Sequence, residues 1–281
     1  MKAIEVMGVI NLTPDSFSDG GRFDAPLDAV HRVEQLMDEG ASFIDVGGES
    51  TRPGAEPIDP AQECARVLPV IEAVADQVRQ HGARLSIDTR NEATARAAVA
   101  AGASLINDVS ASLWPVAAEL GVGWVAMHMA GDPRTMQADP HYDDVVGEVR
   151  RFLVERATVA AAAGVEVWVD PGIGFGKTTE HNLQLLAHVG KLVAEGFPVV
   201  VGTSRKRFLG ELLARSDAPG HRLGDLSSAA EVTAVPVDDR LDGSVATATW
   251  TMTQGVQMVR VHDVAPTVRA ATIVAGGFRG T

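Results

Sequence analysis

Eight short apolar or β-branched runs recur along this chain, and a longer amphipathic stretch follows each of them. The runs predict strands at residues 4–10, 42–47, 84–88, 104–107, 123–127, 165–169, 198–202 and 257–261. The stretches predict helices at 27–39, 60–80, 91–101, 113–120, 143–163, 181–195, 205–214 continued by 243–254, and 265–275. Continuous apolar strands that alternate with helices are typical of parallel strands covered on both faces. Eight such units favour an α/β fold of the (β/α)8 TIM-barrel type.

The length of 281 residues fits either two average domains or one barrel, which needs about 250 residues. Glycines favour the single barrel, because six of them stand just after a predicted helix and just before a strand, where a left-handed helix cap is expected. They are Gly40, Gly82, Gly102, Gly121, Gly164 and Gly196. We therefore expect one domain over 1–281.

Residues 215–242 interrupt the seventh helical segment with Pro, Gly, Ser and many charged residues. The composition indicates an insertion in the seventh βα unit. A surface loop without a function of its own and a lid or partner contact both fit it.

The charge balance limits the kinds of partner. Lys and Arg number 24 against 37 Asp and Glu, a formal net charge of -13, which opposes binding to nucleic acid or to an anionic membrane. An anionic ligand therefore needs a local basic patch. The single cysteine, Cys64, excludes an internal disulfide and a thiolate metal cluster. The apolar run before Asn11 is too short for a signal peptide or a spanning helix, so we expect a cytoplasmic protein.

Polar residues stand at the carboxyl ends of all eight predicted strands, the face of a TIM barrel that carries catalysis. They are Asn11, the segment 49–52, Asp88, the pair Asn107 and Asp108, the pair Met127 and His128, Asp170, the segment 204–206 and the segment 260–262. The loops at the opposite ends are short and marked by Gly or Pro. This one-sided distribution predicts a site at the carboxyl-terminal mouth.

Three acceptor residues of this rim, Asp88, Asn107 and Asp170, come from different strands and are expected to converge. A carboxylate accepts two hydrogen bonds side by side, which suits a heterocycle with a ring N–H beside an amino group, as in guanine-like or pterin rings. Taken singly, each Asp could instead serve as a helix cap or turn residue.

Cationic residues gather at the same rim and predict an anion site: Arg52, Arg205, Lys206, Arg207, Arg260 and His262. Arg pairs bidentately with phosphate oxygens, and Lys206 stands at the start of a predicted helix, whose N-terminus also favours negative charge. Solvated surface charge remains the alternative for Arg205 and Arg207. His262 alone would be structural, but its proximity to Arg260 suggests a ligand contact.

The string from Gly172 to Thr178 lacks the spacing of a nucleotide-binding loop, because Pro171 takes the place of its first glycine. A glycine-rich turn after Asp170 either lets backbone approach a flat ligand or is purely structural. Asn11 opens a polar loop, and its amide oxygen could help to hold Mg²⁺ already bound to phosphates. No cluster of ligands indicates zinc or iron, and His128, His141 and His181 are interpreted as structural.

Several strings are specific enough to carry a resemblance: MGVINLTPDSFSDGG, DVGGESTRPGA, SIDT, IND, MHM, DPGIGFGKTTEHN, VGTSRKRFLG and RVHDV. In this order and at strand ends, over nearly the whole chain, they resemble the dihydropteroate synthase family of bacterial folate biosynthesis. The resemblance implies a transferase that condenses 6-hydroxymethyl-7,8-dihydropterin diphosphate with 4-aminobenzoate, giving 7,8-dihydropteroate and diphosphate. We expect an SN1-like displacement. It also implies a cytoplasmic homodimer, a Mg²⁺ cofactor and a target of sulfonamides.

The resemblance also implies roles for residues. Pterin contacts fall on Asp88, Asn107, Met127, Asp170 and Lys206, of which Asp88, Asp170 and Lys206 are the expected catalytic groups. Diphosphate contacts fall on Asn11, Arg52, Arg260 and His262, with Mg²⁺ at Asn11. Aminobenzoate contacts fall on loops 12–23 and 50–57, with Thr51, Arg52, Pro53 and Phe175 beside them. Some relatives have Ser where this chain has Arg207, so no contact is assigned to that guanidinium.

Two other functions remain open at this point. A pterin-binding methyltransferase of the same barrel type would keep the acceptor residues but would not need Lys206, Arg260 and His262 for diphosphate. A paralogue that binds a ligand or partner without catalysis would be expected to lose residues of the loops or the anion site, and the sequence shows no such loss.

Overall fold

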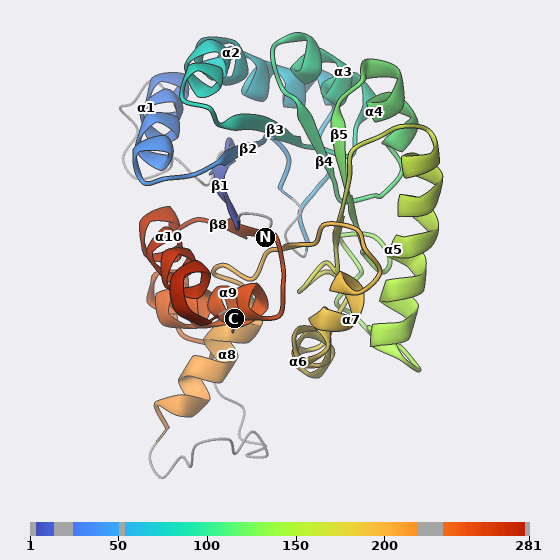
Figure 1. Ribbon diagram of the computed structural model, residues 1–281, viewed down its shortest axis with the longest axis vertical. Helices are drawn as coiled ribbons and strands as arrows, with labels where there is room; N and C mark the ends of the chain where they lie inside the picture. The colour runs from blue at the N-terminus through green and yellow to red at the C-terminus, as the bar shows by residue number, and fades with distance from the viewer. Residues whose placement is uncertain (1–3, 14–24, 51–53, 219–232, 279–281) are drawn as a thin grey trace.

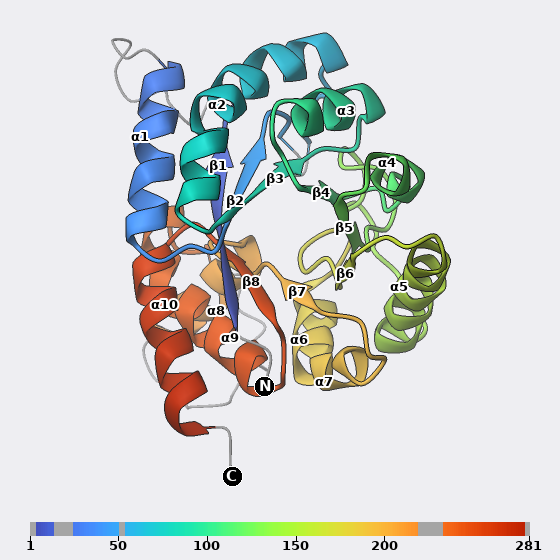
Figure 2. The same ribbon diagram turned by 45° about the horizontal axis from the view of Figure 1, so that its top comes forward.

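The computed structural model describes residues 4–13, 25–50, 54–218 and 233–278. Its strands form one parallel 8-stranded sheet in the order β6-β5-β4-β3-β2-β1-β8-β7. They are β1 Glu5–Asn11, β2 Phe43–Gly47, β3 Arg84–Asp88, β4 Leu105–Asp108, β5 Gly123–Met127, β6 Val167–Asp170, β7 Val200–Val201 and β8 Met258–Val261. Helices surround the sheet on its outside (Figures 1 and 2). The predicted (β/α)8 barrel is confirmed, and the eight strands lie where the sequence places them.

The barrel closes weakly between β6 and β7. The two-residue strand β7 pairs with β8, whereas an isolated parallel bridge between Val169 and Val199 connects it to β6. One backbone hydrogen bond of 2.9 Å, from the N–H of Val169 to the carbonyl of Pro198, supports this bridge. We call this junction the β6–β7 seam.

The helices follow the predicted order with local differences. They are α1 Ala25–Asp38, α2 Pro60–Gln80, α3 Glu92–Ala100, α4 Trp114–Leu120, α5 Val145–Ala162, α6 Thr179–Ala187, α7 Val189–Val193, α8 Arg207–Ser216, α9 Leu241–Thr253 and α10 Val264–Ile273. A 3₁₀ turn, η2 Val237–Arg240, precedes α9, and a π-helical turn, η3 Val274–Phe278, follows α10. The single helix predicted at 181–195 is wrong, because the backbone of His188 (φ -114°, ψ 15°) separates α6 from α7.

Local sequence explains the helix ends. At the start of α2, the Asp59 carboxylate accepts the N–H of Ala61 at 2.7 Å, and Pro60 supplies a fixed φ in the first turn. The six glycines predicted to end helices all have a positive φ, from 66° at Gly121 to 123° at Gly102. At Gly102 an added Cβ would also lie 2.6 Å from the Cβ of Ala75, so the cap and the packing both require glycine.

The region predicted as an insertion is shorter than expected at both ends. Helix α8 runs to Ser216, and η2 and α9 begin at Val237 and Leu241, inside the range 215–242. Residues 219–232 lie outside the described part of the chain. Gly243 of α9 packs against Leu209 of α8, where an added Cβ would lie 3.4 Å from Leu209 Cβ. The two halves of the seventh helical segment therefore pack side by side.

Two apolar clusters stabilise the barrel. The larger one fills the space between the strands and the helices. The smaller one lies inside the barrel and consists of Met7, Phe43, Leu105, Val125, Trp168, Val200 and Met258. Side chains alternate along a strand, so the residues two positions further along also point inward. In β2, β4 and β8 these residues are Asp45, Asn107 and Arg260, and the barrel interior changes there from apolar to polar.

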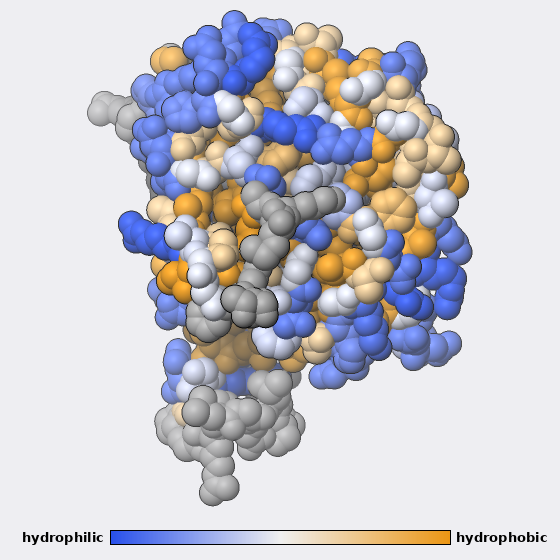
Figure 3. All heavy atoms as spheres, in the orientation of Figure 1, coloured by the Kyte–Doolittle hydropathy of each residue, from blue (hydrophilic) through white to orange (hydrophobic). Residues whose placement is uncertain are grey.

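The outer surface is mainly hydrophilic over the helices at the edge of the face drawn in Figure 3, with more hydrophobic residues toward its middle. In the described ranges, no helix is both long enough and apolar enough to cross a membrane.

Asp108, at the end of β4, organises the loop that follows. Its buried carboxylate accepts the backbone N–H groups of Ser110, Ser112 and Leu113 at 2.7 to 2.8 Å, and the indole N–H of Trp124 at 3.1 Å. The side chain is fully buried, so these donors cannot turn to water if the acceptor is lost. The network fixes the end of β4 directly beside Asn107.

Replacing Asp108 by Asn puts an N–H₂ group against donors that need an acceptor. We expect Asp108→Asn to lower the free energy of unfolding by about 3 kcal/mol, measured by urea denaturation. Asp143→Asn, which changes a 99% exposed side chain, is the matched control and should leave stability unchanged. Equal stability of the two variants would contradict the assigned role of Asp108.

Candidate active site

Strand register brings the predicted acceptor residues together at the carboxyl-terminal mouth. Asp88 at the end of β3 lies directly opposite Asn107 of β4, and Met127 at the end of β5 lies opposite Asp170 of β6. Asn107, Met127 and Asp170 are 4 to 6% exposed. The mouth is thus lined by acceptor groups on one arc, with a thioether beside them.

Arg260 of β8 reaches across the mouth to two carboxylates. Its Nε donates to Asp45 Oδ2 and its Nη2 donates to Asp88 Oδ2, both at 2.6 Å. Burial raises the pKa of Asp88 to about 7, and the charge of Asp45 adds to this shift while Arg260 opposes it. Burial acts to lower the pKa of Arg260, but Asp45 and Asp88 together outweigh it and raise the pKa, so the guanidinium remains charged.

At the Asp170 end of this arc, Asp170, Lys206 and Phe175 meet around the glycine-rich turn. Asp170 Oδ1 accepts the N–H of Gly172 at 2.7 Å, and Lys206 Nζ donates to the carbonyl of Ile173 and lies 4.6 Å from the centroid of the Phe175 ring. Burial raises the pKa of Asp170 and lowers that of Lys206 to about 8, while the opposite charge of each partner opposes its shift. Lys206 can therefore gain or lose a proton near neutral pH.

Gly172 explains why this turn is rich in glycine. Its φ is 66°, and an added Cβ would lie 1.8 Å from the carbonyl oxygen of His128. Any other residue would displace the turn and its hydrogen bond to Asp170. The turn therefore has a structural role and also carries Phe175 to the mouth.

The lysine of the same string is buried and contacts neighbouring protein groups. Lys177 is 3% exposed, and its Nζ lies 3.0 Å from His128 Nδ1 and 3.0 Å from the carbonyl of Phe175. Burial lowers the pKa of Lys177 to about 7 and that of His128 to about 3. His181 forms a capping box with Thr178 at the start of α6. These contacts agree with structural roles for both histidines.

The predicted cationic cluster divides into two groups. Lys206, Arg260 and His262 belong to the mouth, where the N–H of His262 donates to Ser204 Oγ at 3.1 Å and its Nδ1 lies 3.1 Å from the same oxygen. Arg205 instead pairs with Asp263 at 2.6 Å, and the 86% exposed Arg207 pairs with Glu211. The exposed Arg207 therefore fits the alternative of solvated surface charge, whereas Arg205 is 34% exposed and held by Asp263.

Thr51, Arg52 and Pro53 lie outside the described residues, as do most of loop 12–23 and part of loop 50–57. Asn11 ends β1 at the same mouth and is half-buried. Over the described ranges, no group of three or more His, Cys, Asp and Glu side chains could hold a metal ion. Asn11 offers a single amide oxygen, which fits a hard cation that takes most of its ligands from phosphate and water.

Asp45 is a site residue that sequence reasoning missed, whereas Ser204 belongs to the predicted strand end 204–206 and only its contact with His262 is new. Asp45 is fully buried and touches Ser86, Asn107 and Arg260. The available signal was the alternation of β2, which places Asp45 on the inward face with Phe43 and Gly47. Asp45 was not recognised as a site residue because it lies in the middle of the predicted strand 42–47, away from the polar strand end.

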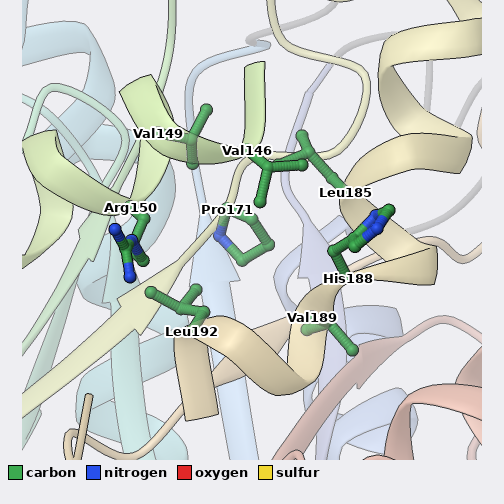
Figure 4. Close-up of a pocket in the computed structure, with 8 residues that line it drawn as sticks. All are labelled: Val146, Val149, Arg150, Pro171, Leu185, His188, Val189 and Leu192. Carbon is green, nitrogen blue, oxygen red and sulfur yellow. The ribbon is translucent and has the colours of Figure 1, made fainter. Parts of the chain in front are cut away.

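A separate hollow of 10 Å³ lies between α5, α6 and α7 (Figure 4). Its lining is mostly apolar, including Val146, Val149, Leu185 and Leu192, and Figure 4 shows these residues grouped around Pro171. It is too small for a substrate and contains none of the predicted site residues.

Comparison with known proteins agrees with this geometry. A family model described as "Pterin binding enzyme" matches residues 7–262. Dihydropteroate synthase of Escherichia coli (strain K12) is 40% identical over 276 residues, covering 96% of this chain and 90% of that protein. Its counterpart in Mycobacterium leprae is 42% identical over 284 residues, covering 96% and 92%.

Solved structures agree as well. Xanthomonas albilineans dihydropteroate synthase with 4-aminobenzoic acid has a TM-score of 0.85 and 43% identity, covering 99% of this chain and 94% of that one. The same enzyme in complex with 7,8-dihydropteroate has a TM-score of 0.82 and 41% identity, covering 99% and 95%. The chain therefore belongs to the pterin-binding enzymes, and within them to the dihydropteroate synthases, which are transferases of folate synthesis.

Asp170→Asn tests the acceptor arc. An amide has one oxygen, so it can serve either the N–H of Gly172 or a ligand donor, but its N–H₂ group then opposes the other. We expect the affinity for a pterin to fall at least about tenfold in titration calorimetry. Asp143→Asn is again the control. An unchanged dissociation constant for the Asp170 variant would exclude the contact.

Proposed function

We propose that this chain condenses 6-hydroxymethyl-7,8-dihydropterin diphosphate with 4-aminobenzoate, releasing 7,8-dihydropteroate and diphosphate. The observation that carries the proposal is the meeting of Asp88, Asp170, Lys206 and Arg260 around one barrel mouth. Relatives studied with 4-aminobenzoic acid and with 7,8-dihydropteroate support it. The proposal includes the cytoplasmic homodimer, inhibition by sulfonamides and the single domain that the sequence predicts.

The acceptor arc suits the pterin. Asp88, Asn107 and Asp170 can accept from the ring N–H and exocyclic amino groups, and Lys206 can donate to a ring acceptor. Met127 is 4% exposed and offers an apolar surface to the flat ring. We assign these five residues to pterin binding.

The cations suit the leaving group. Arg260 retains a free Nη1 with respect to the described residues, and His262 lies two positions further along the chain. We assign both to the diphosphate, together with Arg52 and Asn11. Mg²⁺ held at Asn11 and the phosphate oxygens would neutralise charge on the departing diphosphate. Phe175, with Thr51, Arg52 and Pro53, is assigned to the aminobenzoate.

The displacement is SN1-like. The bond between the pterin methylene carbon and the diphosphate oxygen breaks, and its electron pair leaves with diphosphate. Asp88 and Asp170 stabilise positive charge on the ring as it develops. The lone pair of the aniline nitrogen then forms the C–N bond, and the proton it loses goes to solvent or diphosphate. No strong base is needed, because this nitrogen is neutral at pH 7; positioning and exclusion of water carry the reaction.

Incubating the purified protein with the pterin diphosphate, 4-aminobenzoate and Mg²⁺ tests the function. We expect release of diphosphate that requires aminobenzoate, with dihydropteroate identified by mass spectrometry. Release without aminobenzoate would indicate a hydrolase. Binding of the pterin without any release would indicate a non-catalytic relative, and either result contradicts the proposal.

Arg260→Ala tests the anion site. Loss of the guanidinium should reduce kcat/KM for the pterin diphosphate more than about tenfold, because charge-assisted hydrogen bonds to the leaving group disappear. Arg207→Ala is the matched control, since this side chain is 86% exposed and lies outside the mouth. If both folded variants retain the wild-type kcat/KM, Arg260 has no part in the reaction.

A further inference from the structure

Asp45 lies one layer below the mouth and has no contact with solvent. It stands beside Ser86 in the register of β2 and β3, two positions before Gly47, which lies beside Asp88. Its side chain is 0% exposed. A buried carboxylate is costly unless its charge and its oxygens are satisfied, so its partners reveal what it does.

The carboxylate of Asp45 accepts three hydrogen bonds. Oδ1 accepts from Ser86 Oγ at 2.5 Å, and Oδ2 accepts from Asn107 Nδ2 at 2.9 Å and from Arg260 Nε at 2.6 Å. Two of these donors belong to residues assigned above to substrate. Asp45 therefore holds one group of the pterin site and one group of the diphosphate site with a single oxygen atom.

The contact with Asn107 fixes which end of its amide faces the ligand. An ionised carboxylate only accepts, so the nitrogen of Asn107 must turn toward Asp45. The amide oxygen is then the end left for the ligand. The oxygen of Asn107 therefore selects for a ring that presents a hydrogen-bond donor. This orientation of the amide depends on its contact with Asp45.

The two carboxylates on Arg260 differ in access. Asp45 is sealed inside the barrel, whereas the Asp88 side chain is 14% exposed at the mouth. A ligand arriving at the mouth can displace the Nη2 bond to Asp88 but cannot reach the Nε bond to Asp45. Once Arg260 has released it, Asp88 becomes available to ligand donors.

We propose that Asp45 is a positioning residue that holds Arg260 and Asn107 in place while Arg260 exchanges Asp88 for the phosphate oxygens of the substrate. The inference rests on the proposed function and deepens it. Binding of the anion and binding of the ring are coupled in this arrangement, because the guanidinium that takes the phosphate is the group that frees Asp88 for the ring.

Asp45→Asn keeps the size of the side chain and removes its charge. We expect kcat for the pterin diphosphate to fall at least about tenfold, while the KM for 4-aminobenzoate stays within about twofold. Glu166→Gln is the matched control, since it also removes a carboxylate paired with an arginine, Arg84, at the other end of the barrel. The control should keep wild-type kinetics.

The pH dependence of pterin affinity separates positioning from a merely structural role. The charged groups that interact electrostatically with Asp88 are Arg260, Lys206 and the carboxylates of Asp45, Glu63 and Asp108. The charge of Asp45 contributes to raising the pKa of Asp88 to about 7, so wild-type affinity should fall as the pH drops through 7 and Asp88 takes up a proton. Without that charge the pKa of Asp88 falls. In Asp45→Asn the loss of pterin affinity on the acid side of the pH profile (the acid limb) should therefore move to lower pH. Loss of packing alone would not move it.

A crystal structure of the wild-type protein with the pterin diphosphate gives a test that does not depend on the variant folding. We expect Arg260 Nε to remain within hydrogen-bonding distance of Asp45 while Nη2 contacts phosphate. Arg260 leaving Asp45, or Asp45→Asn with wild-type kcat and an unmoved acid limb, would overturn the inference alone. A wild-type protein that releases no diphosphate would overturn the proposed function and this inference with it.

Discussion

The compensation of buried charge inside the barrel is the constraint on which the site depends. Arg260 lies between Asp45 and Asp88 and donates to both at 2.6 Å, so its positive charge compensates these two acidic groups. Beneath them lies the apolar cluster that includes Met7 and Met258, which offers these charges no hydrogen-bonding groups. The polar groups of the site therefore stand on an apolar layer, and a ligand can rearrange only the contact between Arg260 and Asp88.

Opposed pKa shifts give the mouth its chemical character. Burial raises the pKa of Asp88 and Asp170 and lowers that of Lys206. The pKa values of the two acids and of the base are therefore all shifted toward neutral pH. Buried groups with shifted pKa values are stabilised most when a ligand supplies a matching hydrogen bond or charge. A polar heterocycle with donors on one edge and an anionic tail meets both needs, which is why one cavity can hold two chemically different parts of a substrate.

Much of this architecture could be predicted from the sequence. Strand positions follow from apolar runs, and helix ends follow from glycines that need a positive φ, as at Gly102. The break at His188 was missed because hydrophobic periodicity continues across it. Asp45 was missed because its importance depends on Arg260, 215 residues away in the chain, and no local pattern reports such a contact. Arg205 and Arg207 look alike in sequence, and only the positions of Asp263 and Glu211 separate them from Arg260.

The β6–β7 seam lies between the two strands that lead to Asp170 and to Lys206. Backbone pairing contributes little there, so the distance between this acid and this base depends mainly on packing and on whatever occupies the space between them. A ring bound between Asp170 and Lys206 would therefore link the two strands of this junction through side-chain contacts.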